Sequence, residues 1–183
     1  MEESLNRTVK DVPFTAAVIT ICDQRAKEER IEESGSAAVQ MLREEGYEVV
    51  ETIAIPNEPD TLKKELIRLA DQRGVDLIIT SGGTGFSVTD RTPEITMELA
   101  DRNAPGIAEY IRMRSVEITE KAMLGRGVSV LRKGTLIINL PGSAKAVRES
   151  LDFISHTLDH GLGILRGSAS KYDWKKIDFG GWE

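Results

Sequence analysis

The chain has 183 residues, of which 40% are hydrophobic and 30% are charged, and its formal net charge is −6 at pH 7. This length and composition are typical of one globular domain with short appendages, and the acidic balance argues against nucleic acid as a main partner. The single cysteine, Cys22, excludes an intramolecular disulfide and a multi-cysteine metal site. No apolar run approaches about 18 residues and the acidic N-terminal stretch is not a signal peptide, so we expect no membrane contact and a cytoplasmic location.

The first half of the chain alternates between two apolar patterns. Runs of apolar and β-branched residues are typical of strands buried on both faces of a sheet, and they occur at residues 14–22, 48–55 and 77–80. Apolar residues at helical spacing between these runs predict two helices, over residues 34–46 and 61–73. Gly46 is the expected end of the first helix, and Asp60 is the expected N-cap of the second.

The second half continues with helices and a hairpin. Thr92 is the expected cap of a helix that has Pro93 at its first position and ends near Asn103, and another helix is expected from about Ile107. Two short apolar runs flank Arg132-Lys133-Gly134 and predict an antiparallel hairpin, with strands over residues 128–131 and 135–140. A last helix is expected to begin after a cap at Ser143.

Alternating strands and helices with short links predict a three-layer α/β fold. We expect a mostly parallel central sheet with helices on both faces and one antiparallel hairpin. This single domain is expected to span residues 14–166. A polar, flexible arm at residues 1–13 would precede it, and a polar tail at residues 167–183 would follow it.

The end of the third predicted strand carries the strongest functional signal. It reads Ser81-Gly82-Gly83-Thr84-Gly85, and Asp90 follows five residues later. Glycines at a strand end let backbone N–H groups approach an anion, and a carboxylate just beyond can hold Mg²⁺ against phosphate oxygens. The pattern therefore predicts a phosphate-bearing ligand with a metal, against the alternative of a plain Gly-rich turn. It has neither the P-loop nor the dinucleotide spacing.

Other candidate residues have both a functional and a plain explanation. For Asp90, the functional explanation is a metal ligand, and the plain one is a negative charge that complements a helix N-terminus. The turn Pro141-Gly142-Ser143, with Lys145 in the helix that it opens, is an anion site or a simple cap beside a solvated lysine. Asp23, at the end of the first strand, binds ligand or is a solvated loop charge.

Four ordered segments resemble the molybdenum cofactor biosynthesis proteins of the MogA/MoaB type. The first three are Thr20–Arg25, Glu33-Ser34-Gly35, and the Gly82–Gly85 loop with Asp90-Arg91-Thr92-Pro93-Glu94. The fourth is Asn139-Leu140-Pro141-Gly142-Ser143-Ala144-Lys145-Ala146. The similarity covers the whole expected domain, and four segments in family order are strong evidence where each alone is weak.

The resemblance implies a molybdopterin-binding fold and the activity of a molybdopterin adenylyltransferase. Such an enzyme transfers AMP from ATP to molybdopterin and releases pyrophosphate. The resemblance also implies Mg²⁺, a homotrimer, and other enzymes of the same pathway as partners. It gives Asp90 the metal and catalytic role. Nucleotide and substrate binding fall to Asp23, to residues 81–85 (Ser81, Gly82, Gly83, Thr84, Gly85) and to Pro141, Gly142, Ser143 and Lys145.

The chain departs from the family pattern at two positions. Asn57 stands where the family has a second catalytic aspartate; it keeps an acceptor oxygen but carries no charge. Gly125 stands where the family usually has serine, before Arg126. The leading hypothesis is therefore a Mg²⁺-dependent adenylyltransferase that uses Asp90 and Asn57. The alternative is a catalytically weak or inactive molybdopterin-binding scaffold, and a third is a generic nucleotide-binding α/β protein.

Overall fold

The computed structural model describes residues 12–22 and 28–169. The strands are β1 (Thr15–Cys22), β2 (Glu48–Pro56), β3 (Leu77–Ser81), β4 (Arg102–Asn103), β5 (Ser129–Arg132) and β6 (Thr135–Leu140). The helices are α1 (Glu28–Glu44), α2 (Pro59–Ile67), α3 (Thr92–Glu98), α4 (Pro105–Val116) and α5 (Ala144–Ala169). A π-helical turn η2 (Arg68–Arg73) extends α2, and a short 3₁₀ helix η3 (Glu120–Leu124) follows α4.

The strands form one sheet in the order β2-β1-β3-β6-β5-β4. β1, β2, β3 and β6 are parallel, whereas β5 is antiparallel to β6 and β4 is antiparallel to β5. The mostly parallel sheet and the predicted hairpin are therefore confirmed. The strand order changes direction between β1 and β3, and such a switch point opens a crevice at the carboxyl ends of the strands.

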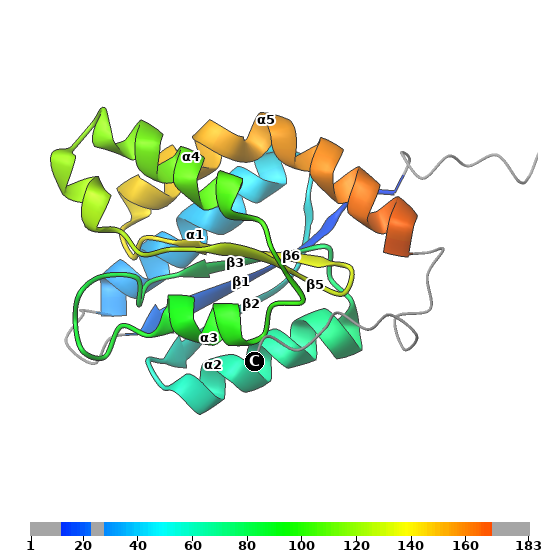
Figure 1. Ribbon diagram of the computed structural model, residues 1–183, viewed down its shortest axis with the longest axis horizontal. Coiled ribbons are helices and arrows are strands. Elements are labelled where there is room, and N and C mark those ends of the chain that lie inside the picture. The colour runs from blue at the N-terminus through cyan, green and yellow to red at the C-terminus, as the bar shows by residue number, and fades with distance from the viewer. Residues whose placement is uncertain (1–11, 23–27, 170–183) are drawn as a thin grey trace, which may run out of the picture.

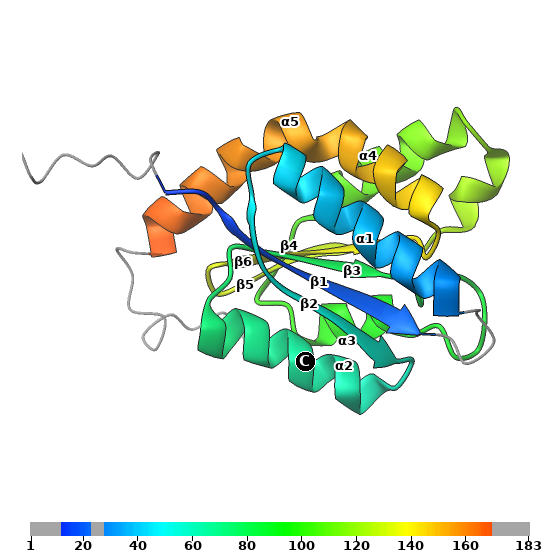
Figure 2. The ribbon, with the colours of Figure 1, turned by 180° about the vertical axis from the view of Figure 1, so that it is seen from behind.

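Helices cover both faces of the sheet, as predicted. Figures 1 and 2 show α1, α4 and α5 on one face and α2 and α3 on the other. Alternate residues of β1 point to opposite faces: Val18 joins the core under α1, α4 and α5, and Ile19 joins the core under α2 and α3. Burial on both faces explains why the central strands are continuous apolar runs. Among the described helices, none has the length and apolar character needed to cross a membrane.

The first two helix starts differ from the predicted ones. α1 begins at Glu28 and not at Ser34, because the intervening glutamate- and arginine-rich residues are good helix formers. α2 begins at Pro59, with Glu58 as its N-cap, so the prediction of Asp60 as cap is wrong. Proline favours the first helical position, which places Asp60 in the first turn, where its charge complements the helix dipole.

The segment after β3 also differs in detail. α3 has Arg91 as its N-cap and Thr92 as its first residue, one position earlier than predicted. The helix ends at Glu98 and not near Asn103, because Arg102 and Asn103 pair with β5 as strand β4. The predicted cap at Ser143 is confirmed, since the Ala146 N–H donates to Ser143 Oγ at 3.3 Å.

The end of α5 is tied to the start of the sheet by Arg166. Its guanidinium donates to both carboxylate oxygens of Asp76, at 3.0 and 2.7 Å, and to the carbonyls of Val12 and Pro13, at 2.8 and 3.1 Å. Asp76 Oδ2 also accepts from the N–H and hydroxyl of Thr15, at 2.8 and 2.7 Å. Burial by itself raises the pKa of Asp76, but the bonds from Arg166 and Thr15 outweigh burial and hold this pKa below its ordinary value.

Arg166→Ala is expected to lower the free energy of unfolding at pH 7 by about 2 kcal/mol, because it leaves a largely buried carboxylate without its cation. A carboxyl group with a lowered folded pKa stabilises the fold above its unfolded pKa of about 4, and this stability is lost as the pH falls through the folded value. Urea unfolding at pH 7 and pH 3 should therefore show a smaller acid-induced loss in Arg166→Ala than in the wild type. Arg148→Ala removes an exposed charge from the same helix and serves as the control; equal acid sensitivity of both variants would contradict the prediction.

Candidate functional site

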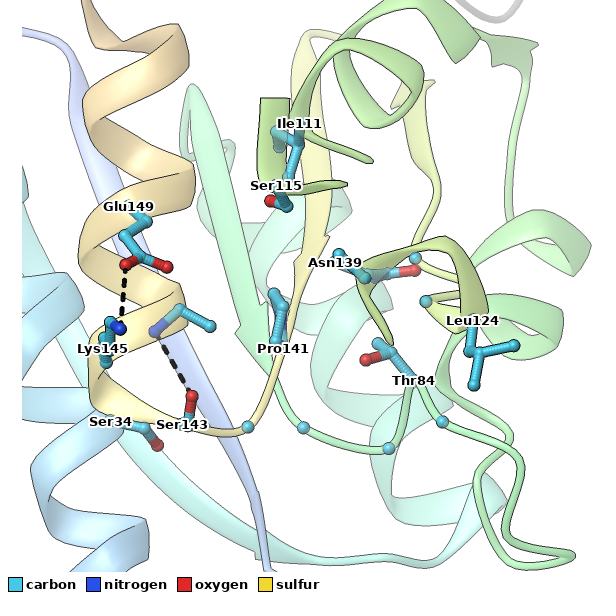
Figure 3. Close-up of a pocket in the computed structure, with 18 of the residues that line it drawn as sticks. Ser34, Thr84, Ile111, Ser115, Leu124, Asn139, Pro141, Ser143, Lys145 and Glu149 are labelled. Carbon is cyan, nitrogen blue, oxygen red and sulfur yellow. Dashed lines mark hydrogen bonds and ion pairs between the residues drawn. The ribbon is translucent and has the colours of Figure 1, made fainter. Parts of the chain in front are cut away.

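A cavity of about 980 Å³ lies at the carboxyl ends of β1, β3 and β6. Its main walls are the loop after β3, the turn between β6 and α5, and the segment formed by α4 and η3, and residues of β1 and α1 complete the lining. Figure 3 shows Lys145 and Glu149 on one side, Thr84 and Leu124 on the other, and Pro141 between them. The cavity therefore forms at the switch point of the sheet, where open α/β folds bind ligands.

The Gly-rich loop takes a backbone path that requires glycine. Gly82 and Gly83 have φ angles of 102° and 65°, in the left-handed region. A Cβ on Gly83 would lie 2.2 Å from the hydroxyl oxygen of Thr92, the first residue of α3. The Thr92 N–H donates to the Gly83 carbonyl at 3.1 Å, and the Gly82 N–H donates to Leu140 at the end of β6. The loop is thus held against both α3 and β6.

Asp90 shapes this loop and also faces the cavity. Its Oδ2 accepts hydrogen bonds from the N–H groups of Gly85 at 3.1 Å and Ser87 at 3.3 Å. Its Oδ1 accepts no hydrogen bond from the described part of the chain. Asp90 is half-buried and lines the cavity, so one carboxylate oxygen builds the loop while the other is available to a ligand or cation.

The N-terminus of α5 forms the opposite wall. Ser143 Oγ caps the helix, and the Val147 N–H donates to the Ser143 carbonyl at 2.9 Å. Lys145 is 79% exposed, and its ammonium lies 3.7 Å from the carboxylate of Glu149 one turn later (Figure 3). A helix N-terminus and a solvated ammonium both favour anions, so this wall is suited to a phosphate group.

The third wall was not predicted from the sequence. It comes from α4 and η3, with polar groups that include the side chains of Arg112, Ser115, Thr119 and Lys121. Arg112 donates to the carbonyl of Gly125 at 2.8 Å. Glu33 and Ser34 at the start of the family-like Glu33-Ser34-Gly35 segment also line the cavity. The cavity lining holds three cationic and three acidic side chains, so its preference for anions must come largely from backbone N–H groups and from local placement of charge.

The structure brings most predicted site residues together. The cavity is lined by Gly82, Gly83, Thr84, Gly85, Asp90, Pro141, Gly142, Ser143 and Lys145. Ser81 does not line it; this serine is buried, and its hydroxyl donates to the Pro141 carbonyl at 3.0 Å. Ser81 thereby joins the two ligand-facing turns. Asp23 lies outside the described residues.

Asn57 lies at the end of β2, beyond β1, and is not among the residues that line the cavity. Its backbone N–H donates to the Cys22 carbonyl at 3.1 Å, so this hydrogen bond holds the Asn57 backbone beside the last residue of β1. Burial raises the pKa of the Cys22 thiol, which disfavours the reactive thiolate form.

The oxygen ligands at the Gly-rich loop suit a Mg²⁺ ion that is bound together with substrate phosphates. They do not suit a metal ion that is held by protein side chains alone. Within residues 12–22 and 28–169, no group of three or more His, Cys, Asp or Glu side chains is placed to hold a metal ion. Mg²⁺ is commonly bound by one or two carboxylates together with substrate phosphates and water. A single available oxygen on Asp90, beside a loop suited to phosphate, matches that pattern.

Comparison with known proteins agrees with this geometry. The family model described as a probable molybdopterin binding domain matches residues 17–160. Molybdenum cofactor synthesis protein cinnamon of Drosophila melanogaster is 36% identical over 159 residues, which are 86% of this chain and 26% of that protein. Molybdopterin adenylyltransferase of Haemophilus influenzae is 43% identical over 103 residues, which are 56% of this chain and 52% of that protein.

A solved structure is similar over nearly its whole length. The molybdopterin biosynthesis enzyme MoaB of Thermus thermophilus has 42% sequence identity and a TM-score of 0.78, and the match covers 84% of this chain and 97% of that one. By contrast, the chain spans about a quarter of the Drosophila relative and about half of the Haemophilus relative. The family model, the aligned relatives and the shared fold show that this chain belongs to the MogA/MoaB family of molybdenum cofactor biosynthesis proteins.

Proposed function

We propose that this chain is a molybdopterin adenylyltransferase, which transfers AMP from ATP to molybdopterin and releases pyrophosphate. One observation carries the proposal: two elements suited to phosphate, the Gly82–Gly85 loop and the N-terminus of α5, face one cavity from opposite sides. Joining two phosphate-bearing substrates requires such a pair of sites. The cavity volume of about 980 Å³ lies at the upper end of the range for small-molecule sites and leaves room for both.

The name of the Haemophilus relative supports the same activity, since that protein is called a molybdopterin adenylyltransferase. We assign ATP to the Gly-rich loop beside Asp90, and the terminal phosphate of molybdopterin to Ser143 and Lys145. The loop N–H groups would cradle the ATP phosphates, and Lys145 would orient the attacking phosphate oxygen toward the α-phosphorus. A phosphate monoester is itself the nucleophile, so the protein contributes mainly position and charge complementarity.

Asp90 is the residue that would hold Mg²⁺, through the oxygen that is not used by Gly85 and Ser87. When bound, the ion would supply positive charge at the phosphate oxygens, where negative charge grows during transfer. The chain's own contribution is to fix one carboxylate oxygen at the rim of the loop and to present backbone donors beside it.

The direct test is an assay of purified protein with ATP, Mg²⁺ and molybdopterin. We expect pyrophosphate to appear only when all three are present, together with adenylylated molybdopterin in equal amount. Tight binding of molybdopterin without pyrophosphate release would reject the enzyme and favour the scaffold alternative. Binding of ATP without any binding of molybdopterin would favour a generic nucleotide-binding protein.

Lys145→Ala is expected to weaken molybdopterin binding about tenfold and ATP binding much less, because it removes a cation from the α5 wall only. The effect should shrink at high salt, because the ammonium is exposed to solvent. Titration calorimetry with each ligand, at low and high salt, makes the comparison. Arg148→Ala removes the same charge from an exposed position of α5 outside the cavity lining and should change neither affinity. Equal weakening of both ligands by Lys145→Ala would show that the two phosphate sites are assigned wrongly.

Substitution of Asn57 distinguishes the adenylyltransferase hypothesis from the scaffold alternative. If its side chain turns toward the metal during turnover, Asn57→Asp should lower the Mg²⁺ concentration for half-maximal activity, because affinity for a divalent ion grows with ligand charge. Its position outside the cavity lining favours the other result, an unchanged metal dependence. A wild type that turns over normally would then show that the family's second aspartate is dispensable here. Activity that appears only in Asn57→Asp would instead identify the wild-type chain as the weak or inactive form.

We also propose that the chain forms a homotrimer, as its resemblance to the family implies. Large apolar side chains are exposed on α4 and in the segment that follows it: Tyr110, Met113, Ile118, Met123 and Leu124. Exposed apolar groups that gather on one segment are typical of an interface. Sedimentation equilibrium of the full chain should give three times the mass of 20.2 kDa, and a monomer would contradict this proposal.

A further inference from the structure

Arg126 reaches the Gly-rich loop from the segment between η3 and β5. Its Nε donates to the Gly85 carbonyl at 2.8 Å, and one terminal nitrogen donates to the Asp90 carbonyl at 2.5 Å. The other terminal nitrogen forms an ion pair with Glu94 in the first turn of α3. The backbone N–H of Arg126 also donates to the Thr84 carbonyl at 3.0 Å. Each nitrogen of the guanidinium is therefore engaged by the loop or by the helix that follows it.

These contacts close the loop between Gly85 and Asp90 from outside. From inside, the Asp90 carboxylate accepts the N–H groups of Gly85 and Ser87, and the Asp90 N–H donates to the Ser87 carbonyl at 2.9 Å. Asp90 is thus fixed twice, by its carbonyl through Arg126 and by its carboxylate through the loop amides. Loss of the Arg126 contacts would leave the Asp90 carboxylate held only by the amides of Gly85 and Ser87.

The segment that carries Arg126 is itself fixed. Arg112 of α4 donates to the carbonyls of Gly125 and Gly127, at 2.8 and 3.4 Å, on either side of Arg126. A Cβ on Gly127 would lie 2.7 Å from the Asn139 carbonyl, so this residue runs directly against β6. The position of Arg126 therefore follows from α4 and β6, both of which are well-packed parts of the fold.

We propose that Arg126 is a positioning residue of the site, which holds the Asp90 carboxylate and the 85–90 loop in place without touching substrate. The proposal rests on the function proposed above for the role of Asp90. The contacts of Arg126 with Gly85, Asp90 and Glu94, here called the brace, do not depend on that function. Arg126 does not line the cavity, and its donors are directed at protein acceptors. These contacts distinguish it from a cation that binds phosphate directly.

Arginine suits this role because its planar guanidinium presents several donors in a fixed fork. Lysine has one charged nitrogen on a flexible chain and cannot reach two carbonyls and a carboxylate in the same geometry. Glu94→Gln weakens one of the three side-chain contacts and leaves the two carbonyl contacts intact. The three variants Arg126→Ala, Arg126→Lys and Glu94→Gln therefore remove the brace to different degrees.

Hydrogen exchange of the loop amides tests the brace without any ligand. In Arg126→Ala, the exchange rates of the Gly85 and Ser87 amides should rise at least about tenfold, while those of the β1 and β3 amides stay unchanged. Arg126→Lys should give most of this increase, and Glu94→Gln a smaller part. Arg91→Ala removes the same charge from an exposed neighbour of Asp90 and should leave both amides as protected as in the wild type.

The catalytic readout is a separation of kcat from KM. With an active enzyme, Arg126→Ala should lower kcat about 100-fold, as expected for a displaced catalytic group, and leave KM for molybdopterin close to the wild-type value. A phosphate ligand would instead show its main effect in substrate binding. If the wild type shows no adenylylation, the proposed function fails, and the exchange experiment still decides the brace.

Unchanged exchange at Gly85 and Ser87 in Arg126→Ala would overturn the proposal, as would an equal rise in Arg91→Ala. If Arg126→Ala loosens the whole sheet, Arg126→Lys decides the question. Faster exchange confined to the loop in that variant supports a positioning role. The same loosening of loop and sheet would show that Arg126 is a general structural residue, and the proposal would be rejected.

Discussion

Asp90→Ala is expected to lower the rate of adenylylation by at least about 100-fold, because it removes the one carboxylate of the Gly-rich loop that is available to a cation. The variant should remain folded, since Asp90 contributes no apolar surface to either core. Its free energy of unfolding should fall by about 1–2 kcal/mol, because the amides of Gly85 and Ser87 lose their acceptor. Single-turnover kinetics at saturating ATP and molybdopterin, with circular dichroism as a check of the fold, give the measurement.

Asp90→Asn separates the charge from the shape of the loop. The amide oxygen of asparagine can still accept from Gly85 and Ser87, so stability should stay near that of the wild type. The negative charge is lost, so the rate should remain as low as in Asp90→Ala. If Asp90→Asn turns over at the wild-type rate, Asp90 serves only to close the loop and the catalytic assignment is wrong.

The parts of the fold that were predicted correctly are those whose environment dictates residue type. β1, β3 and β6 are buried on both faces, and such strands must be continuously apolar. The loop at Gly82 and Gly83 was found because two residues with positive φ in succession favour glycine. These constraints are local, so the sequence displays them directly.

The wall formed by α4 and η3 shows why other parts were missed. α4 directs Ala108 and Ile111 into the molecule but also exposes Tyr110 and Met113, so its apolar residues do not mark one buried face. β4 has two residues and forms through backbone pairing with β5, which leaves no pattern in composition. Contributions of this kind depend on the assembled fold, and only the structure reveals them.

Arg126 illustrates the same limit within the site. In the sequence, Gly125 departs from the family's usual serine before Arg126, and nothing there indicates which groups the arginine contacts. The structure instead directs the arginine at Gly85, Asp90 and Glu94, which lie 32 to 41 positions earlier in the chain. A contact between segments so far apart leaves no periodic pattern in the sequence. The sequence also does not indicate which acceptors an arginine side chain will contact.

Gly83→Ala is expected to destabilise the fold by about 3 kcal/mol, with two separate causes. A left-handed φ costs a non-glycine residue about 1–2 kcal/mol, and the added methyl group would overlap the Thr92 hydroxyl, which costs about 1–3 kcal/mol when neighbours must shift. In a Thr92→Ala background the hydroxyl is gone and the nearest remaining atom is the Cβ of residue 92, at 3.3 Å, so the same substitution should cost only about 1–2 kcal/mol. Gly161→Ala, on α5 with nothing within 4 Å of the new methyl group, should instead stabilise the protein by about 0.5–1 kcal/mol. Urea unfolding of the wild type and these variants gives the three differences in free energy of unfolding, and a Gly83→Ala variant as stable as the wild type would show that this loop does not need glycine there.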